Sequence, residues 1–233
     1  MLGVDAVILA GGRGSRLSGA LPGVAKVLAP VKGRPFLDYV LDFLVAQGVA
    51  RIVVSVGHLQ EQVVGRYQDF RSVPLRFSRE DVPLGTGGAV RRALEQVRSD
   101  PFIALNGDSL CHVELQRLVA LHAEHRAQAT VVLARPDARS DVGNAWLNSE
   151  SRVISFAEKS AGDTGKTGER FMNAGIYAFR QSAFSDFSAV SFSLEHDLLP
   201  RLVESRGCYG LVAPGAIIDI GTPDRYAQAQ SLL

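Results

Sequence analysis

The sequence predicts an α/β fold in which parallel strands are connected by helices. Residues 6–10 form a short apolar run that is rich in strand formers and bounded by glycine, which is typical of a buried parallel strand. Residues 36–44 carry apolar side chains at helical spacing, and Gly48 is placed to end that helix. The alternation continues through a strand at 51–56, a helix at 59–67 and an apolar segment at 74–78. Sheets of this kind bind ligands at the carboxyl ends of their strands.

The same alternation continues toward the C-terminus, with less regularity after residue 134. The pattern predicts helices at 86–97, 113–125, 194–205 and from 222 onward, and strands at 102–105, 130–134, 145–147, 153–156, 175–179 and 217–220. Thr86 and Ser193 are the expected N-caps of their helices. The polar residues 160–170 are interpreted as a mobile insertion and a candidate lid. No internal repeat or low-complexity linker divides the chain, so residues 1–233 are predicted to form one domain in two functional halves.

Composition and charge exclude several classes of protein. The chain has 233 residues, of which 46% are hydrophobic and 21% charged, as expected for an ordinary globular domain. Its 25 basic and 24 acidic residues give a formal charge of +1, so no global field favours nucleic acid or an anionic membrane. Asp5 interrupts the apolar N-terminal residues 1–10, and no stretch reaches the roughly 18 apolar residues of a membrane span. Cys111 and Cys208 stand alone, so we expect a cytoplasmic protein with reduced thiols.

The loop after the first predicted strand has the composition of a phosphate-binding loop. Gly11, Gly12 and Gly14 permit positive φ angles and leave backbone N–H groups uncovered, so that these can point together at an anion. Arg16 can hold two phosphate oxygens with its planar fork, and Lys26 can supply a point charge to a second phosphate. The loop matches neither the dinucleotide fingerprint nor the P-loop, and a tight structural turn is the alternative. The two cations favour binding of a triphosphate.

Two aspartates stand at the ends of short apolar segments beside glycine. They are Asp108 in LNGD and Asp219 in IDIGTP. Mg²⁺ takes one or two carboxylates together with substrate phosphates, so these residues are candidate ligands of a magnesium ion. Each aspartate alone would more simply be a turn residue, but the phosphate loop favours the metal.

Two further segments and two histidines complete the candidate residues. The small residues in Pro83 to Ala89 would let a flat base lie against the backbone, although they also suit a helix N-terminus. A site for sugar hydroxyls and a phosphate is indicated by Glu158, Lys159, Asn173 and Gly175. The alternatives are a solvated charge pair for Glu158 and Lys159 and a turn residue for Asn173. His122 and His125 lack further metal ligands and are interpreted as solvated residues at a helix end.

Taken together, these motifs resemble the sugar-phosphate nucleotidyltransferase family. They span nearly the entire chain and are, in order, AGGRGSRL with Lys26, PLGTGGA, LNGD, FAEK, NAGIY, SLEHDLLP and DIGTP. The resemblance implies a doubly wound α/β fold with a mixed, mainly parallel, Rossmann-like sheet in three αβα layers. It also implies an enzyme that transfers a nucleoside monophosphate to a sugar 1-phosphate with Mg²⁺ and releases pyrophosphate. Residues from 1 to about 110 would bind the nucleotide, and residues from about 111 to 233 the sugar phosphate.

The resemblance also assigns roles to single residues. The nucleotide is expected to contact Leu9, Ala10, Gly11, Gly12, Gly14, Ser15, Arg16, Glu80, Gly85, Thr86, Asn106 and Asp108. Arg16, Lys26 and Asp108 are the expected catalytic residues, and Asp108 and Asp219 the expected metal ligands. Contacts to the sugar phosphate are expected from Gly143, Glu158, Lys159, Asn173 and Gly175. Relatives often carry a lysine after a proline where this chain has Ala25-Lys26, which leaves the course of the loop open.

The most specific expectations concern which nucleotide donates the transferred group and which sugar 1-phosphate accepts it. Guanine presents two adjacent donors that one carboxylate can accept, and Glu80 is the candidate, so GTP is the expected donor. A carboxylate could also meet uracil, which keeps UTP and dTTP as alternatives. A heptose 1-phosphate acceptor is implied only by resemblance, for surface polysaccharide synthesis, with mannose 1-phosphate as its alternative. A non-catalytic nucleotide-sugar sensor is the rival from another class, and a homodimer is left open.

Overall fold

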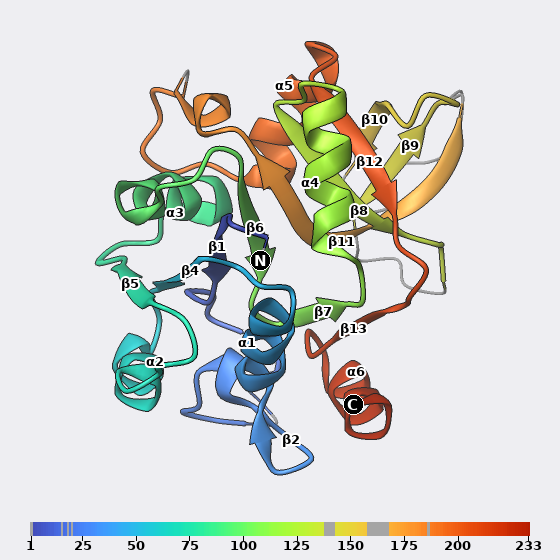
Figure 1. The fold of residues 1–233 in the computed structure, drawn as a ribbon. Helices are drawn as coiled ribbons and strands as arrows, with labels where there is room; N and C mark the ends of the chain where they lie inside the picture. The colour runs from blue at the N-terminus through green and yellow to red at the C-terminus, as the bar shows by residue number, and fades with distance from the viewer. Residues whose placement is uncertain are drawn as a thin grey trace.

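The computed structural model is built on one nine-stranded mixed sheet that runs through both halves of the chain (Figure 1). It describes residues 2–233 except 15, 18, 20, 138–142, 158–167 and 186. In the first half the strands are parallel in the order β6-β1-β4-β5. Their bounds are β1 (Asp5–Leu9), β4 (Arg51–Val56), β5 (Leu75–Arg79) and β6 (Phe102–Asn106). Because the chain leaves β1 toward β4 and later returns to β6 on the other side, β1 lies at the topological switch point of the sheet.

The second half joins the first through the long strand β11 (Glu169–Phe179). Its last four residues pair with β6, and all its pairings are antiparallel. The other strands of this half are β8 (Ala129–Ala134), β9 (Asn144–Leu147), β10 (Val153–Ala157) and β12 (Cys208–Val212). The sheet is therefore parallel where the glycine-rich loop lies and mixed beyond it.

Two apolar cores cover the two faces of the sheet. Side chains of a strand alternate between faces, and in β1 Ala6 and Ile8 belong to one core whereas Val7 belongs to the other. The first core includes α1 (Phe36–Ala46), α2 (Gln60–Tyr67) and α4 (Leu115–Glu124), and Figure 1 shows α1 and α4 in front of the strands. The second core includes α3 (Gly85–Ala93) and α5 (Leu199–Glu204). The predicted three-layer αβα fold is confirmed.

A short ribbon and the C-terminal helix extend the first face. Strand β7 (Ser109–Cys111), which follows β6 closely, pairs antiparallel with β13 (Ile217–Asp219). Helix α6 (Pro223–Leu232) follows and is capped by the hydroxyl of Thr222, as its sequence indicates. The side-chain amide of Gln230 on α6 holds the hairpin of β2 (Pro30–Val31) and β3 (Arg34–Pro35): it accepts from Lys32 N and donates to Pro30 O, each at 2.9 Å.

Most predicted elements occur where expected, and the differences are local. Ser193 caps its helix as predicted, although the first turn, Leu194–Leu198, is a π-helix. Thr86 is not an N-cap, because its hydroxyl bonds Glu195 and Leu194 N instead of its own helix. Of the candidate lid, residues 160–167 lie outside the described part, and Glu169 and Arg170 belong to β11.

The prediction of a solvated His122 was wrong, because this residue is fully buried on α4. Its Nδ1 lies 3.0 Å from the hydroxyl of Thr130 on β8, whereas its Nε2 is buried without a hydrogen-bond partner. Burial, together with the positive charge of Arg180, lowers the pKa of His122 to about 4, and Asp100 opposes the shift. The histidine therefore acts as a neutral core residue. His125, four-fifths of a turn further along, stacks on Tyr209.

We expect the free energy of unfolding to fall as the pH decreases from about 6.5 toward 4. In the unfolded chain His122 takes up a proton near its ordinary pKa, whereas in the folded chain it does so only near 4, so acid favours unfolding. The loss over this window is about 3 kcal/mol, since one pKa unit corresponds to about 1.4 kcal/mol. Denaturant titrations at several pH values measure it. His122→Asn should flatten the profile and His125→Asn should not; equal profiles in all three proteins would contradict the assignment.

Candidate active site

A hollow among the described residues lies where β1, β4, β5 and β6 end. It has a volume of about 730 Å³ and is lined by Leu9, Ala10, Gly11, Gly12, Arg13, Lys26, Val27, Gly57, His58, Leu59, Gln60, Glu80, Asp81, Val82, Pro83, Gly85, Thr86, Ala89, Asn106, Asp108 and Glu195. A volume of this size fits a nucleotide-sized ligand. The position is that of a ligand site at the switch point of a doubly wound sheet.

The glycine-rich loop follows β1 directly and makes close contacts at two of its glycines, Gly11 and Gly14. A Cβ atom at Gly11 would lie 3.1 Å from Glu80 Oε1 and 3.2 Å from Gly57 N, so a larger residue would push these groups apart. Gly14 has a φ of +61°, and a Cβ there would lie 3.0 Å from the Cβ of Lys26. The loop therefore needs glycine at both places, once for close approach and once for backbone conformation.

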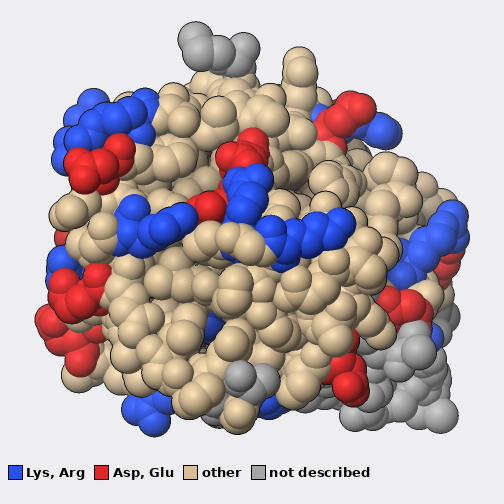
Figure 2. Space-filling model, turned by 90° about the horizontal axis from the view of Figure 1, so that it is seen from below, with Lys and Arg blue, Asp and Glu red and all other residues tan. Residues whose placement is uncertain are grey.

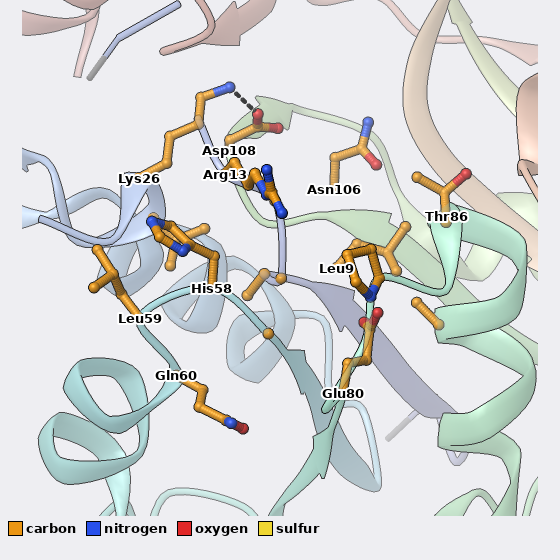
Figure 3. A pocket seen from close by; sticks show the side chains of 18 of the residues that line it. Leu9, Arg13, Lys26, His58, Leu59, Gln60, Glu80, Thr86, Asn106 and Asp108 are labelled. Atoms are coloured by element: carbon orange, nitrogen blue, oxygen red, sulfur yellow. Dashed lines mark hydrogen bonds and ion pairs between the residues drawn. The ribbon is translucent and has the colours of Figure 1, made fainter. Parts of the chain in front are cut away.

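Lys26 and Asp108 form an ion pair at one side of the hollow (Figure 3). Lys26 begins the short 3₁₀ turn Lys26–Leu28, and Asp108 follows β6 after Asn106 and Gly107. Gly107 N donates to Leu9 O at 2.9 Å, and a Cβ at Gly107 would lie 2.9 Å from the same oxygen. The glycine thus lets the chain turn across β1 and carry Asp108 toward Lys26. The side chain of Lys26 is 14% exposed and that of Asp108 32%, so the pair faces the hollow with limited solvent.

Glu80 lies on the other side of the hollow, together with Thr86 (Figure 3). It follows β5, and its carboxylate is held by two donors: Ser55 Oγ donates to Oε1 at 2.9 Å, and Leu84 N donates to Oε2 at 3.1 Å. A carboxylate has about four acceptor sites, so this one can accept further donors from a ligand. The alternative of a solvated surface charge does not fit these contacts.

Glu195, to which the sequence assigned no role, lines the hollow and accepts hydrogen bonds from three hydroxyl groups. Its Oε2 accepts from Thr86 Oγ1 at 2.8 Å and from Ser193 Oγ at 3.1 Å, and its Oε1 accepts from Tyr177 OH at 3.2 Å. Tyr177 OH in turn accepts from Asn173 Nδ2 at 2.7 Å. This network connects the start of α3 with β11, and hence the two halves of the chain. Its position within SLEHDLLP was the one available signal.

The glycines of α3 have a different partner from the one predicted. A Cβ at Gly87 would lie 2.3 Å from the ring of Phe192, and one at Gly88 would lie 2.6 Å from Val190 O. These two glycines therefore make room for the chain's own segment and not for a flat base. The residues of this stretch that line the hollow are Pro83, Gly85, Thr86 and Ala89.

Asp219 lies on a strand whose backbone pairs with the segment just after Asp108, but it does not line the hollow. Register in the β7–β13 ribbon places Asp219 opposite Ser109, and Ile220 N donates to Asp108 O at 3.1 Å. The carboxylate of Asp219 bonds Arg225 Nη1 at 3.1 Å and Gly221 N at 2.8 Å. The second contact is the turn geometry that an isolated aspartate predicts. Within the described residues, no three His, Cys, Asp or Glu side chains gather as a metal cluster.

The remaining predicted residues divide into two groups. Gly14, Arg16, Gly143, Asn173 and Gly175 are described but do not line the hollow, and Arg16 is exposed. Ser15, Glu158 and Lys159 lie outside the described residues. Arg13, within AGGRGSRL, and His58, outside every quoted motif, also line the hollow, and the sequence assigned neither a role.

The surface agrees with the near-neutral composition. On the face seen from below, basic and acidic side chains lie interspersed among uncharged ones, so no broad surface of one sign appears there (Figure 2). No helix among the described residues has the length and apolar character needed to cross a membrane.

The fold and the hollow define a nucleotide-binding α/β protein, because the glycine-rich loop after β1 lies at the switch point with a cation and a carboxylate beside it. Residues 5–233 match the profile of the family described as Nucleotidyl transferase, and the chain belongs to that family. The motif-based expectation is confirmed.

Several relatives and solved structures are similar over almost the whole chain. D-glycero-alpha-D-manno-heptose 1-phosphate guanylyltransferase of Aneurinibacillus thermoaerophilus is 32% identical, over 99% of this chain and 98% of that protein. Mannose-1-phosphate guanylyltransferase of Mycobacterium tuberculosis is 29% identical over 98% of this chain and 64% of its own length. The crystal structure of HddC from Yersinia pseudotuberculosis complexed with GMP-PN has a TM-score of 0.83 and 28% identity, covering 98% of this chain and 99% of that one.

Proposed function

We propose that this enzyme transfers GMP from GTP to a sugar 1-phosphate and releases pyrophosphate. The observation that carries the proposal is the arrangement of one hollow, with the Lys26–Asp108 pair at one side, the Glu80 carboxylate at the other, and the glycine loop between them, from Gly11 beside Glu80 to Gly14 beside Lys26. Such a site suits a ligand with a polyanion at one end and a base with two donors at the other. The similar guanylyltransferases and the HddC complex support the guanine nucleotide.

The phosphate end would work through charge and backbone donors. The N–H groups of the loop and Lys26 would hold the triphosphate, and Arg16 the leaving pyrophosphate by its planar fork. Two polyanions must meet during the reaction, so the barrier depends on cations placed in advance. Ser15 and Lys159, which the sequence assigns to the loop and to the sugar phosphate, would complete this set.

The acceptor we propose is D-glycero-α-D-manno-heptose 1-phosphate, with mannose 1-phosphate as the second candidate. Both occur as named substrates among the similar proteins. Gly143, Asn173 and Gly175, with Glu158 and Lys159, are the proposed sugar-phosphate contacts. Asn173 Oδ1 accepts from Gly175 N at 3.0 Å, and the amide is also bonded to Tyr177, which would fix its orientation toward sugar hydroxyls.

Mg²⁺ is the proposed cofactor, and the donor set fits it. Asp108 and Asp219 supply two hard oxygen donors from neighbouring backbone, and Mg²⁺ commonly takes only one or two carboxylates and completes its shell with substrate phosphates and water. When bound, the ion would neutralise charge on the reacting phosphates. Asp219 also bonds Arg225, which would keep its carboxylate in a fixed place.

The chemistry needs no nucleophile from the protein. An oxygen of the sugar 1-phosphate attacks the α-phosphorus of GTP in line, the bond to the bridging oxygen breaks, and pyrophosphate leaves with that electron pair. The protein holds both substrates in line and stabilises the charge that develops. The product is an activated sugar, which we place in cytoplasmic synthesis of a surface polysaccharide.

A panel assay of pyrophosphate release tests the function. Purified protein with Mg²⁺ is given GTP, ATP, UTP, CTP or dTTP together with heptose 1-phosphate or mannose 1-phosphate. We expect the highest kcat/KM with GTP and the heptose, and slower turnover with mannose 1-phosphate. Faster turnover with UTP or dTTP would overturn the guanine assignment. A sensor would give neither pyrophosphate release nor pyrophosphate–GTP isotope exchange in the presence of the nucleotide sugar.

Glu80→Gln is expected to lower kcat/KM for GTP by about 10- to 100-fold, because a hydrogen bond to a charged group is worth about 1.5–3 kcal/mol. The amide oxygen would accept from Leu84 N in place of Oε2, and the NH2 group would then stand in place of Oε1, where Ser55 Oγ can accept from it and where it presents a donor to guanine. Steady-state kinetics with varied GTP measure the effect. Glu95→Gln, an exposed carboxylate away from the hollow, is the control. Unchanged kinetics in Glu80→Gln would show that the base lies elsewhere.

A further inference from the structure

The backbone segment just before Lys26 is held by two hydrogen bonds to one side chain of another helix. Gln62 lies on the exposed side of α2. Its Oε1 accepts from Ala25 N at 2.9 Å, and its Nε2 donates to Gly23 O at 2.8 Å. Gly23 has a φ of +73°, so the backbone turns sharply between the two bonded groups. One amide therefore closes the turn immediately before Lys26.

Helix α2 is itself fastened to the phosphate loop. His58 N donates to Gly11 O at 3.2 Å, and a Cβ at Gly57 would lie 3.1 Å from the same oxygen. Gln60 N donates to Gly57 O at 3.1 Å and opens the helix. The helix that holds the Lys26 segment thus begins in direct contact with the loop.

The remaining contacts of the Lys26 segment connect it back to the phosphate loop. Ala25 O accepts from Leu28 N at 2.8 Å, so Ala25 is bonded on both sides, to Gln62 and to the 3₁₀ turn. The aliphatic stem of Lys26 packs over Gly14 of the phosphate loop. The loop thus contacts α2, Gln62 on α2 bonds the segment before Lys26, and the stem of Lys26 packs on Gly14 of the same loop.

We propose that Gln62 is a positioning residue for the transfer reaction: it sets where Lys26 stands relative to the phosphate loop and so aligns the reacting phosphates. The proposal rests on the proposed function. It accounts for Ala25 preceding Lys26, because the bond to Gln62 needs the backbone N–H of residue 25, and proline has none.

The chain supplies a matched control in Gln230. Its amide bridges Lys32 N and Pro30 O, two residues apart, as that of Gln62 bridges Ala25 N and Gly23 O. Gln230 acts on the β2–β3 hairpin and is absent from the lining of the hollow. Gln62→Ala and Gln230→Ala therefore remove the same two kinds of hydrogen bond from two turns, and only one turn leads into Lys26.

The experiment combines kinetics with amide hydrogen exchange. Gln62→Ala should lower kcat by about 10- to 100-fold, because misplacing a charged group by about 1 Å costs up to that factor. Gln230→Ala should keep kcat within about twofold and lose a similar amount of thermal stability. The amide of Ala25 should exchange faster in Gln62→Ala only. In a Lys26→Ala background Gln62→Ala should have no further effect on kcat, because Gln62 acts through that lysine.

Three results would overturn the proposal. They are equal kcat values in the two glutamine variants, fully additive losses in the double variant, and an Ala25 amide whose exchange does not change. Should the wild type release no pyrophosphate with any pair, the proposed function is wrong and the positioning role is judged by binding. Calorimetry with inorganic triphosphate must then show weaker binding in Gln62→Ala than in Gln230→Ala, and equal binding rejects the role.

Discussion

Asp108→Asn is expected to reduce turnover by about 10³-fold while the protein stays folded. The amide keeps the shape of the side chain but removes the negative charge that would hold Mg²⁺ and that now pairs with Lys26. Loss of charge stabilisation at transferring phosphates commonly costs several kcal/mol, and each 1.4 kcal/mol is about tenfold in rate. Initial rates of pyrophosphate release at saturating GTP, over a range of Mg²⁺ concentrations, measure the effect.

Asp42→Asn is the matched control for this variant. Asp42 lies on α1 and pairs with Arg34 at 2.6 Å on the surface, so its variant also loses an ion pair, but Asp42 does not line the hollow. Asp219→Asn tests the second carboxylate, and we expect it too to lose most turnover. Near-normal, magnesium-dependent rates in both Asp108→Asn and Asp219→Asn would reject the metal assignment.

Lys26→Ala is expected to lower kcat by about 10²- to 10³-fold, the usual cost of removing one preorganised charge from a transition state. Lys26 is nearly buried and points into the hollow, where limited water strengthens its action on phosphate oxygens. The loss should appear in kcat more than in KM, because the charge on the reacting phosphates changes most in the transition state. Single-turnover rates with excess enzyme separate chemistry from product release.

Lys32→Ala provides the comparison for Lys26→Ala. Lys32 is an exposed lysine of the β2–β3 hairpin, six residues further along, and does not line the hollow. The Lys32→Ala variant should release pyrophosphate at the wild-type rate. If Lys26→Ala keeps a rate within about threefold of that control, Lys26 does not act on the reacting phosphates.

The sequence by itself determined the elements with strong periodicity. The run before the glycine loop became β1, residues 51–56 became β4 at the predicted bounds, and the apolar stripe from Phe36 became α1, because burial of one face repeats at a fixed period. The short strands β7 and β12 and the hairpin β2–β3 were missed, since their pairing partners lie elsewhere in the chain. Local pattern carries no information on such partners.

The site shows the same division. The residue types in the loop, with Arg16 and Lys26, predict a phosphate site, because that chemistry depends on few groups at short spacing. The burial of His122, the packing of Phe192 on Gly87 and the bonds of Thr86 with Glu195 were not predictable. His122 is buried where α4 packs against β8, and the other two are contacts between segments more than 100 residues apart, so all three are decided only when the sheet brings these elements together. Only the tertiary structure could therefore show that Gln62 holds the turn before Lys26 and that Glu195 connects the two halves.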